Sequence, residues 1–192
     1  MSRTARTSLD KAAVLQAAVD ILNTGGVQAL TLSHLAEKLG IRTPSLYNHV
    51  DGLTGLQQEL AVMNARLLAD RLNEAAIGRS GSELFREVAQ AFRGYVKEYP
   101  ALYMSTLRSS GTQLVQNSNL QHEEERVMKI GMVIMASLGV QGEAAIHGLR
   151  AFRSVVHGFA TLEVAGGFGL PQDCDESFRR LVAALMVGLQ SG

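Results

Sequence analysis

The sequence has little of what several large classes of protein require. A single cysteine, Cys174, among 192 residues excludes an intramolecular disulfide and a zinc site built from cysteines. Eighteen Lys and Arg residues balance 18 Asp and Glu residues, so no overall basic field indicates a nucleic-acid partner. The longest apolar segment, residues 130–140, is too short to cross a bilayer, and the N-terminus lacks a signal-peptide pattern. We therefore expect a cytoplasmic protein with no membrane partner.

What the sequence does contain is a helical pattern along almost its whole length. Apolar residues recur at spacings of three and four, and alternation with a period of two is nearly absent. The pattern predicts an all-α protein of about nine helices. We expect the first three at residues 8–23, 31–39 and 43–50, and a fourth from there to about 76. The other five are expected at residues 82–98, 101–108, 119–138, 143–165 and 175–190.

The first three predicted helices have recognisable beginnings. Thr7 suits the N-cap of the first helix, and Thr31 suits that of the second, which stops at Gly40. We expect Thr43 to cap the third helix, with Pro44 at the first helical position, where a missing N–H costs nothing.

Residues 31–50 have the spacing of a helix-turn-helix. The turn between the two helices needs Gly40, because a residue there takes a left-handed conformation that a β-carbon resists. Residues 1–50 also hold five Lys or Arg against three Asp or Glu, a mild positive surplus. Compact donors and acceptors on the outer face of the second helix suit a major groove: Arg42, Thr43, Ser45, Tyr47, Asn48 and His49. The alternative is a plain corner between two packed helices.

Residues 21–56 resemble the DNA-binding region of TetR-family transcriptional regulators. The positions that match the family's motif are Gly26, Thr31, Leu35-Ala36, Gly40-Ile41 and Leu46-Tyr47-Asn48-His49-Val50. Residues 155–170 (VVHGFATLEVAGGFGL) are similar to a TetR-type ligand-binding domain of the Trp-His-Gly kind, with Val156 in place of Trp. Two positions depart from the family: Leu53 stands where many members have a phosphate-contacting Lys, and Val50 where an aromatic residue is usual.

The resemblance implies a helix-turn-helix DNA-binding domain over residues 1–55 and a helical effector-binding and dimerisation domain over residues 56–192. It implies a ligand-responsive repressor of a palindromic operator, with no cofactor. Carried over by position, the residues facing the groove are Arg42, Thr43, Pro44, Ser45 and Asn48, and those against the sugar-phosphate backbone are Tyr47, His49, Thr31 and Ser33. His49 has the alternative role of a helix cap. Arg3 and Arg6 belong to an N-terminal arm that either follows a groove or has no role.

DNA binding of this kind also predicts a homodimer. One recognition helix reads too few base pairs to find a site, whereas two related by a dyad read a palindrome. Broad apolar faces on the predicted helices 143–165 and 175–190 suit a four-helix bundle across the two-fold axis. The candidate interface residues are Leu149, Phe152, Val156, Phe159, Phe178, Leu181, Val182, Leu185 and Leu189. The alternative is that both helices bury these faces inside one chain.

Methionine and tyrosine side chains in the middle of the chain suit a pocket for a small apolar or amphipathic effector. The candidates are Met63, Phe92, Tyr95, Tyr99, Tyr103, Met104, Met128 and Met132, with His147 and Arg150 as polar anchors. Each of them has ordinary core or helix-surface packing as its alternative role. The family implies that a bound effector moves the helix that follows Gly52.

No motif in the sequence supports catalysis or a metal site. The chain lacks a Gly-x-Ser-x-Gly elbow, a phosphate loop and a His-Glu-x-x-His pair, so we expect no enzyme. His122 has helical spacing to Glu125 and Arg126, but without a second pair this segment is better explained as a solvated helix start than as a metal site. The rival function is a helical small-molecule-binding protein without DNA binding.

Overall fold

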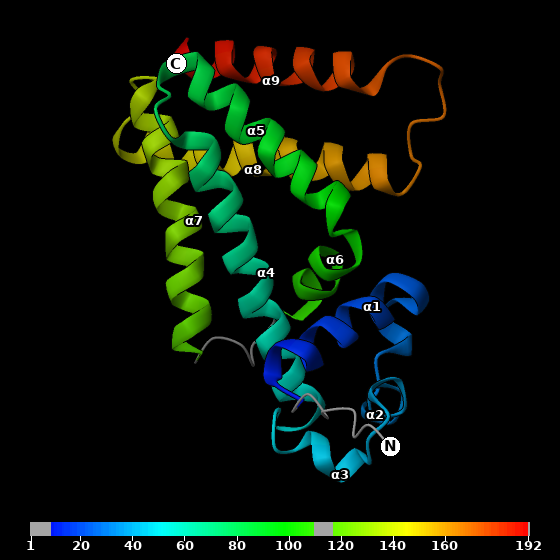
Figure 1. Ribbon diagram of the computed structural model, residues 1–192. Helices are drawn as coiled ribbons and strands as arrows, with labels where there is room; N and C mark the ends of the chain where they lie inside the picture. The colour runs from blue at the N-terminus through cyan, green and yellow to red at the C-terminus, as the bar shows by residue number, and fades with distance from the viewer. Residues whose placement is uncertain (1–8, 110–116, 192) are drawn as a thin grey trace. The chain divides into compact units, whose positions relative to one another are not determined.

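The computed structural model describes residues 9–109 and 117–191 of the chain (Figure 1). That part of the chain contains nine α-helices and no strand, which confirms the predicted all-α fold. From the fifth helix onward, the predicted bounds agree with the observed ones to within one residue. The helices are α1 (Lys11–Ala29), α2 (Leu32–Leu39), α3 (Thr43–Leu46), α4 (Gly52–Ala76), α5 (Gly81–Glu98), α6 (Pro100–Ser109), α7 (Ser118–Ser137), α8 (Gly142–Val164) and α9 (Cys174–Gln190).

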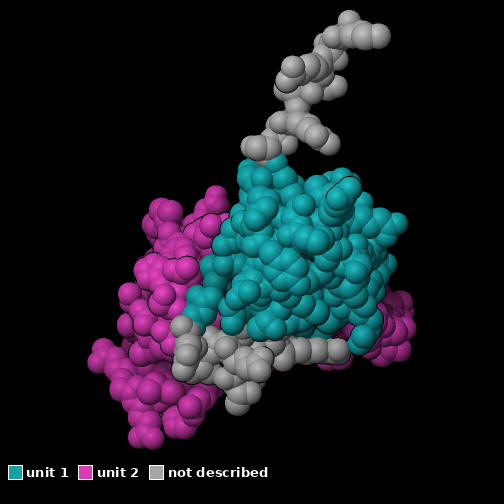
Figure 2. Space-filling view, turned by 90° about the horizontal axis from the view of Figure 1, so that it is seen from below, with its two compact units in different colours: residues 1–63, 101–117 teal, residues 64–100, 118–192 magenta. Residues whose placement is uncertain are grey.

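The chain forms two compact units, each built from two separate stretches (Figure 2). Unit 1 consists of residues 1–63 and 101–117, and unit 2 of residues 64–100 and 118–192. Along the chain, unit 1 first gives way to unit 2 after Met63, inside α4. The predicted domain boundary, between residues 55 and 56, lies nearer the start of that helix. The functional division at residues 55 and 56 stays a prediction.

Unit 1 is organised around the apolar face of α1. Asp10 caps this helix, because its Oδ1 accepts the backbone N–H of Ala13 at 2.8 Å; the predicted cap, Thr7, lies outside the described residues. A left-handed Gly26 (φ 69°) later interrupts α1, and one more turn runs to Ala29. The side chains that unit 1 buries include Val14, Ala18, Ile21 and Leu22 of α1, Leu35 of α2, Leu46 of α3, Leu56 and Leu60 of α4, and Leu102 of α6.

Unit 2 packs α5 against α7, α8 and α9. Phe85 of α5 meets Phe152 of α8 edge to face, with ring centroids 5.1 Å apart. Helix α8 also passes close to its neighbours at Gly148, where a β-carbon would lie 2.8 Å from the sulfur of Met135 and 3.0 Å from Cδ2 of Leu189. Glycine at this position therefore permits the observed approach of α7 and α9 to α8.

A buried arginine ties three helices of unit 2 together. Arg93 of α5 is 1% exposed, and its Nε and Nη2 donate to the two carboxylate oxygens of Glu163 on α8, each at 2.7 Å. Nη2 also lies 2.8 Å from Oδ1 of Asp175 on α9. The guanidinium carbon is 5.4 Å from the ring centre of Phe159 and 4.9 Å from that of Phe178, within range of cation–π attraction. The charge is thus paired, hydrogen-bonded and stacked at once.

Replacing Arg93 by Leu is expected to lower the free energy of unfolding by about 3 kcal/mol, the low end for breaking a buried pair, since Glu163 loses Arg93 but keeps Lys97 as a partner. Chemical denaturation followed by far-UV circular dichroism measures this change. Arg179→Leu is the matched control, because Arg179 pairs with Glu176 on the exposed surface of α9 and contributes little there. Equal losses for the two variants would contradict the structural role of Arg93.

The ion pair also predicts a dependence of stability on pH. The Arg93 guanidinium, helped by the ammonium of Lys97 at 2.7 Å, holds the pKa of Glu163 below its ordinary value of 4.5. A carboxylate whose folded pKa is lowered stabilises the fold above its unfolded pKa, and this stabilisation disappears as the pH falls through the folded pKa. The difference in unfolding free energy between the wild type and Glu163→Gln is therefore expected to shrink between pH 7 and pH 3. A difference that stays constant or grows on acidification would disprove the assignment.

Candidate nucleic-acid interface

Helix α2 begins and ends as the sequence predicts. Thr31 is its N-cap, and the Thr31 hydroxyl accepts the backbone N–H of His34 at 3.1 Å. Gly40 ends the helix in a left-handed conformation (φ 65°), with its N–H donating to the carbonyl of Glu37 at 3.0 Å. The next N–H, that of Ile41, donates to the carbonyl of Ala36 at 3.0 Å. This pair of bonds closes the helix and turns the chain toward α3.

Helix α3 is shorter than predicted. It spans four residues, with Arg42 as an N-cap that makes no side-chain capping bond, so Thr43 is not the cap and Pro44 occupies the second helical position. The chain then continues in tight turns: the N–H of His49 donates to the carbonyl of Leu46 at 2.9 Å, and that of Val50 donates to the same carbonyl at 3.0 Å. The recognition segment is therefore one helical turn extended by a turn conformation through residues 47–49.

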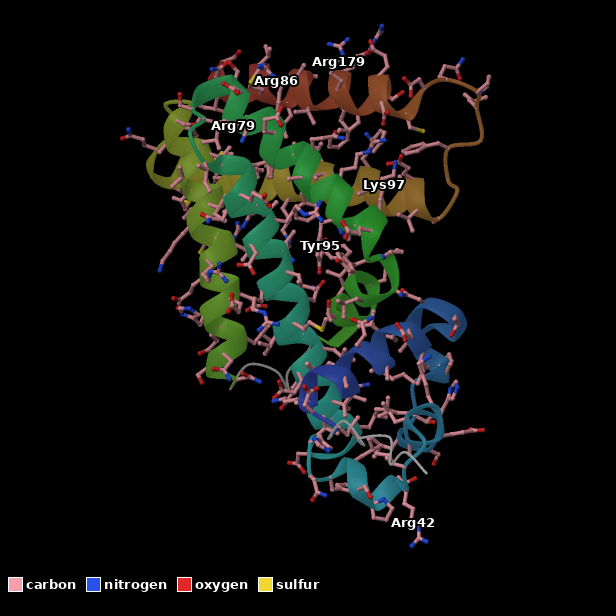
Figure 3. All side chains as sticks on the ribbon, viewed as in Figure 1. Arg42, Arg79, Arg86, Tyr95, Lys97 and Arg179 are labelled. Atoms are coloured by element: carbon pink, nitrogen blue, oxygen red, sulfur yellow. The ribbon has the colours of Figure 1, made fainter. Side chains whose placement is uncertain are left out.

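Burial divides the helix-turn-helix into an inner and an outer face. Leu35, Leu46 and Val50 are buried in unit 1. None of the nine predicted DNA-binding residues is buried: Thr31, Ser33, Arg42, Pro44, Ser45, Tyr47 and Asn48 are exposed, and Thr43 and His49 are half-buried. We call these nine residues the reader surface. Tyr47 is 60% exposed, unusual for a tyrosine unless it has a partner, and Arg42 projects away from the rest of unit 1 (Figure 3).

Two ion pairs near this segment involve residues that sequence reasoning did not connect. Lys38 of α2 lies 3.4 Å from Asp20 of α1, and Lys11 of α1 lies 2.6 Å from Glu59 of α4. The partners are 18 and 48 residues apart in sequence, so no helical spacing signals either pair. Leu53, at the position where the family often has Lys, is exposed.

The predicted effector residues are divided between the two units. Met63, Tyr103 and Met104 belong to unit 1, whereas the other seven belong to unit 2. Tyr95 is buried, and its hydroxyl donates to Oδ1 of Asn64 at 2.6 Å, but Met128 is 59% exposed, and Met132, His147 and Arg150 are exposed as well. A small cavity of about 10 Å³ in unit 1 has room for roughly one water. It is lined by Leu22, Val27, Leu30, Gln57, Leu60, Ser105 and Thr106, none of which is a predicted effector residue.

Five of the nine predicted dimer residues are buried in the core of unit 2. Phe152, Val156, Phe159, Phe178 and Val182 face inward, which is the alternative that the sequence left open, so these side chains do not form a surface for a partner. Leu181 is exposed, and Leu149, Leu185 and Leu189 are half-buried. Other apolar residues that α8 and α9 expose were not predicted from the sequence, namely Ile146, Val164 and Val187. A helix that is apolar on most sides does not indicate by its pattern which side faces inward.

The described part of the chain offers neither a metal-binding cluster nor a single membrane-spanning helix. Within residues 9–109 and 117–191, no three His, Cys, Asp or Glu side chains are grouped so that they could hold a metal ion. No single helix of this part is long and apolar enough to cross a membrane; α7 and α8, bent by 114° where they meet, reach the required length and composition only as a pair.

Comparison with known proteins gives a consistent result. Residues 85–185, more than half of the chain, match the family described as tetracyclin repressor-like, C-terminal domain. An uncharacterized HTH-type transcriptional regulator of Bacillus subtilis, YobS, is 28% identical over 96% of this chain and 94% of its own length. The class D tetracycline repressor protein of Escherichia coli is 37% identical over 47% of this chain and 41% of its own length. A solved structure of a TetR variant from Acinetobacter baumannii AYE in complex with minocycline has a TM-score of 0.70 at 24% identity, covering 95% of this chain and 97% of that one.

Replacing Thr31 by Ala is expected to lower the free energy of unfolding by about 1 kcal/mol, because the N-cap bond to His34 is lost. Amide hydrogen exchange resolves the effect locally, as faster exchange across α2. Thr31→Ser keeps the hydroxyl and should restore protection, and Ser33→Ala, on the same helix, should change little. Unaltered exchange in Thr31→Ala would show that the cap does not stabilise α2.

Proposed function

Because this chain belongs to the tetracycline-repressor-like family of transcriptional regulators, we propose that it represses its target genes by binding a palindromic operator as a homodimer. DNA-binding regulators of this family are not enzymes, and the sequence-based expectation of a regulator is confirmed at that level. We further propose a cytoplasmic location, where the operator is accessible, and release of the operator by a small apolar or amphipathic effector.

The observation that carries the proposal is the reader surface itself. It presents unburied polar side chains on a helix-turn-helix whose inner residues, Leu35, Leu46 and Val50, are held in a core. In the proposed complex, Arg42 donates two hydrogen bonds to a guanine edge and Asn48 pairs with an adenine edge, the usual matches in a major groove. Ser45 lies between them on the same turn of chain.

The remaining members of the reader surface would position the protein on the backbone of the DNA. Thr31 and Ser33 lie at the N-terminus of α2, and a helix N-terminus attracts a phosphate. Tyr47 and His49 follow α3 and are proposed to contact the sugar-phosphate chain from the other side of the groove. Such contacts fix the register and orientation of the reader and leave base discrimination to Arg42 and Asn48.

The dimer is proposed to form through the outer faces of α8 and α9. Ile146 (48% exposed) and Val164 lie on one side of α8, and Leu181 and Val187 lie on α9, so each helix of the pair offers apolar side chains that unit 2 does not cover. Pairing these faces across a two-fold axis would hide them from water and relate two reader surfaces by a dyad. The spacing of the two half-sites would then be about 34–36 Å.

Effector release is proposed to act through α4. This helix is continuous from Gly52 to Ala76 in unit 2. Gly52 comes two residues after Val50, whose buried side chain supports the reader surface. Tyr95 is bonded to Asn64 of this helix, and Arg71 of the same helix is paired with Glu98 of α5. A ligand that repositions α5 would therefore pull on α4 and change the separation of the two recognition segments. The Acinetobacter TetR variant crystallised with minocycline supports a role for ligands in this fold.

The test is selection of bound sequences from a randomised duplex DNA pool by the full-length protein. The wild type should enrich a palindrome with half-sites one helical turn apart. Arg42→Ala/Asn48→Ala should bind the enriched duplex at least about a hundredfold more weakly, because each bidentate base contact contributes roughly 1–3 kcal/mol. Arg86→Ala, an exposed arginine of α5 in unit 2, is the matched control and should bind like the wild type (Figure 3).

Failure to enrich any sequence at low salt would overturn the proposal, as would equal affinities for the double variant and the control. An enriched site without a repeated half-site would support DNA binding and disprove the dimer.

A further inference from the structure

The side chains that the structure describes in unit 1 carry little free positive charge. Among them there are three Lys or Arg, and two of these are held in ion pairs: Lys11 with Glu59 at 2.6 Å and Lys38 with Asp20 at 3.4 Å. Arg42 makes no ion pair with any described residue and points outward into solvent (Figure 3).

The charges of unit 1 nearly cancel. Over residues 1–63 and 101–117 the sequence holds six Lys or Arg against five Asp or Glu, a difference of +1. Asp51 directly follows Val50 and is exposed, and Glu37 is exposed on α2. Leu53, which stands where the family often has a lysine, adds no positive charge. The field around the reader surface is therefore not a broad positive one of the kind that holds DNA without regard to sequence.

We propose that this reader binds its operator with unusually little counterion release, because Arg42 is its principal cationic contact and the lysine of α2 is neutralised by Asp20. The inference rests on the proposed function and concerns the chemistry by which the same surface recognises DNA. It makes Arg42 both the main phosphate-attracting charge and a base-reading side chain, so affinity depends on the same residue that shares base discrimination with Asn48.

The ion pair with Asp20 neutralises Lys38, the other cation near the reader surface. In a helix-turn-helix the first helix crosses the DNA backbone, so a lysine on α2 is well placed to meet a phosphate. Here Asp20 lies 3.4 Å from its ammonium group, and both side chains are partly exposed. If the lysine turned toward a phosphate, the carboxylate would remain close by and repel that phosphate. The pair as a whole is neutral, and a neutral pair displaces no condensed counterion.

The consequence is a weak affinity for DNA in general and a large ratio of specific to non-specific binding. Non-specific binding comes essentially from phosphate contacts, whereas base-edge contacts do not depend on salt in this way. With one cation from each protomer, a dimer would neutralise two phosphates, and log K would fall against log salt with a slope of about −2.

The experiment measures affinity for the selected operator and for a scrambled duplex of equal length at several salt concentrations, by fluorescence anisotropy with the full chain. The wild type should give a slope of about −2 on the operator and a dissociation constant weaker than about 10⁻⁵ M on the scrambled duplex near physiological salt. Arg42→Ala should flatten the slope and reduce the preference for the operator, leaving the part that Asn48 contributes.

Asp20→Asn is the decisive variant, because it keeps the hydrogen-bond acceptor for Gln16 and removes the charge that neutralises Lys38. With one lysine freed in each protomer, the slope should steepen to about −4 and the affinity for both duplexes should rise several-fold. Glu87→Gln, which removes an exposed carboxylate from α5 in unit 2, is the matched control and should leave both slopes unchanged. Arg3→Ala/Arg6→Ala should also leave the slope near −2.

Three results would overturn the inference. They are a wild-type slope of −5 or steeper, a slope that flattens in the Arg3→Ala/Arg6→Ala variant, and an unchanged slope in Asp20→Asn. These outcomes differ from failure of the proposed function, which would appear as equal affinities of the wild type for the operator and the scrambled duplex. A reader with a steep slope that still prefers its operator would keep the proposed function and disprove this inference alone.

Discussion

The arrangement of unit 2 depends on one buried cation. Burying a guanidinium is costly unless carboxylates and hydrogen bonds compensate it, and Arg93 obtains that compensation only where α5, α8 and α9 meet. A shift of any of the three helices by one residue would rotate Glu163, Asp175 or the ring of Phe178 away from the charge. The ion pair therefore specifies the register of these helices in a way that apolar packing alone does not.

That register determines which surfaces of the last two helices remain free. With Phe159 and Phe178 turned toward Arg93, the apolar side chains on the far sides of α8 and α9, such as Ile146 and Val187, are left at the surface. The same interaction that stabilises the core thus defines the surface proposed for dimerisation. The residues that the sequence suggested for the interface are mostly inward-facing ones, because the buried charge that orients these helices is visible only in the folded chain.

Unit 1 is held together by different means. Arg93 is the one buried charged side chain among the described residues, and the reader surface depends on the apolar contacts of Leu35, Leu46 and Val50 and on backbone geometry at Gly40. Its few cations lie at the surface, where ion pairs add little stability but change the local charge strongly. Function in this unit is consequently more sensitive to the placement of charges than its fold is. In unit 2, by contrast, the fold itself depends on the placement of one charge, that of Arg93.

The sequence by itself determined what depends on residues close together in the chain. The helical repeat, the capping hydroxyl of Thr31, the left-handed glycine after α2 and the polar outer face around Arg42 and Asn48 all arise within a few residues, so local patterns predict them. The tertiary structure alone decided the partners of Arg93 and Lys38, the inward faces of α8 and α9, and the assignment of α6 to unit 1. Lys38 and Asp20 are 18 positions apart in the sequence, and Arg93 and Asp175 are 82 positions apart. Only the packing of whole helices brings such residues together.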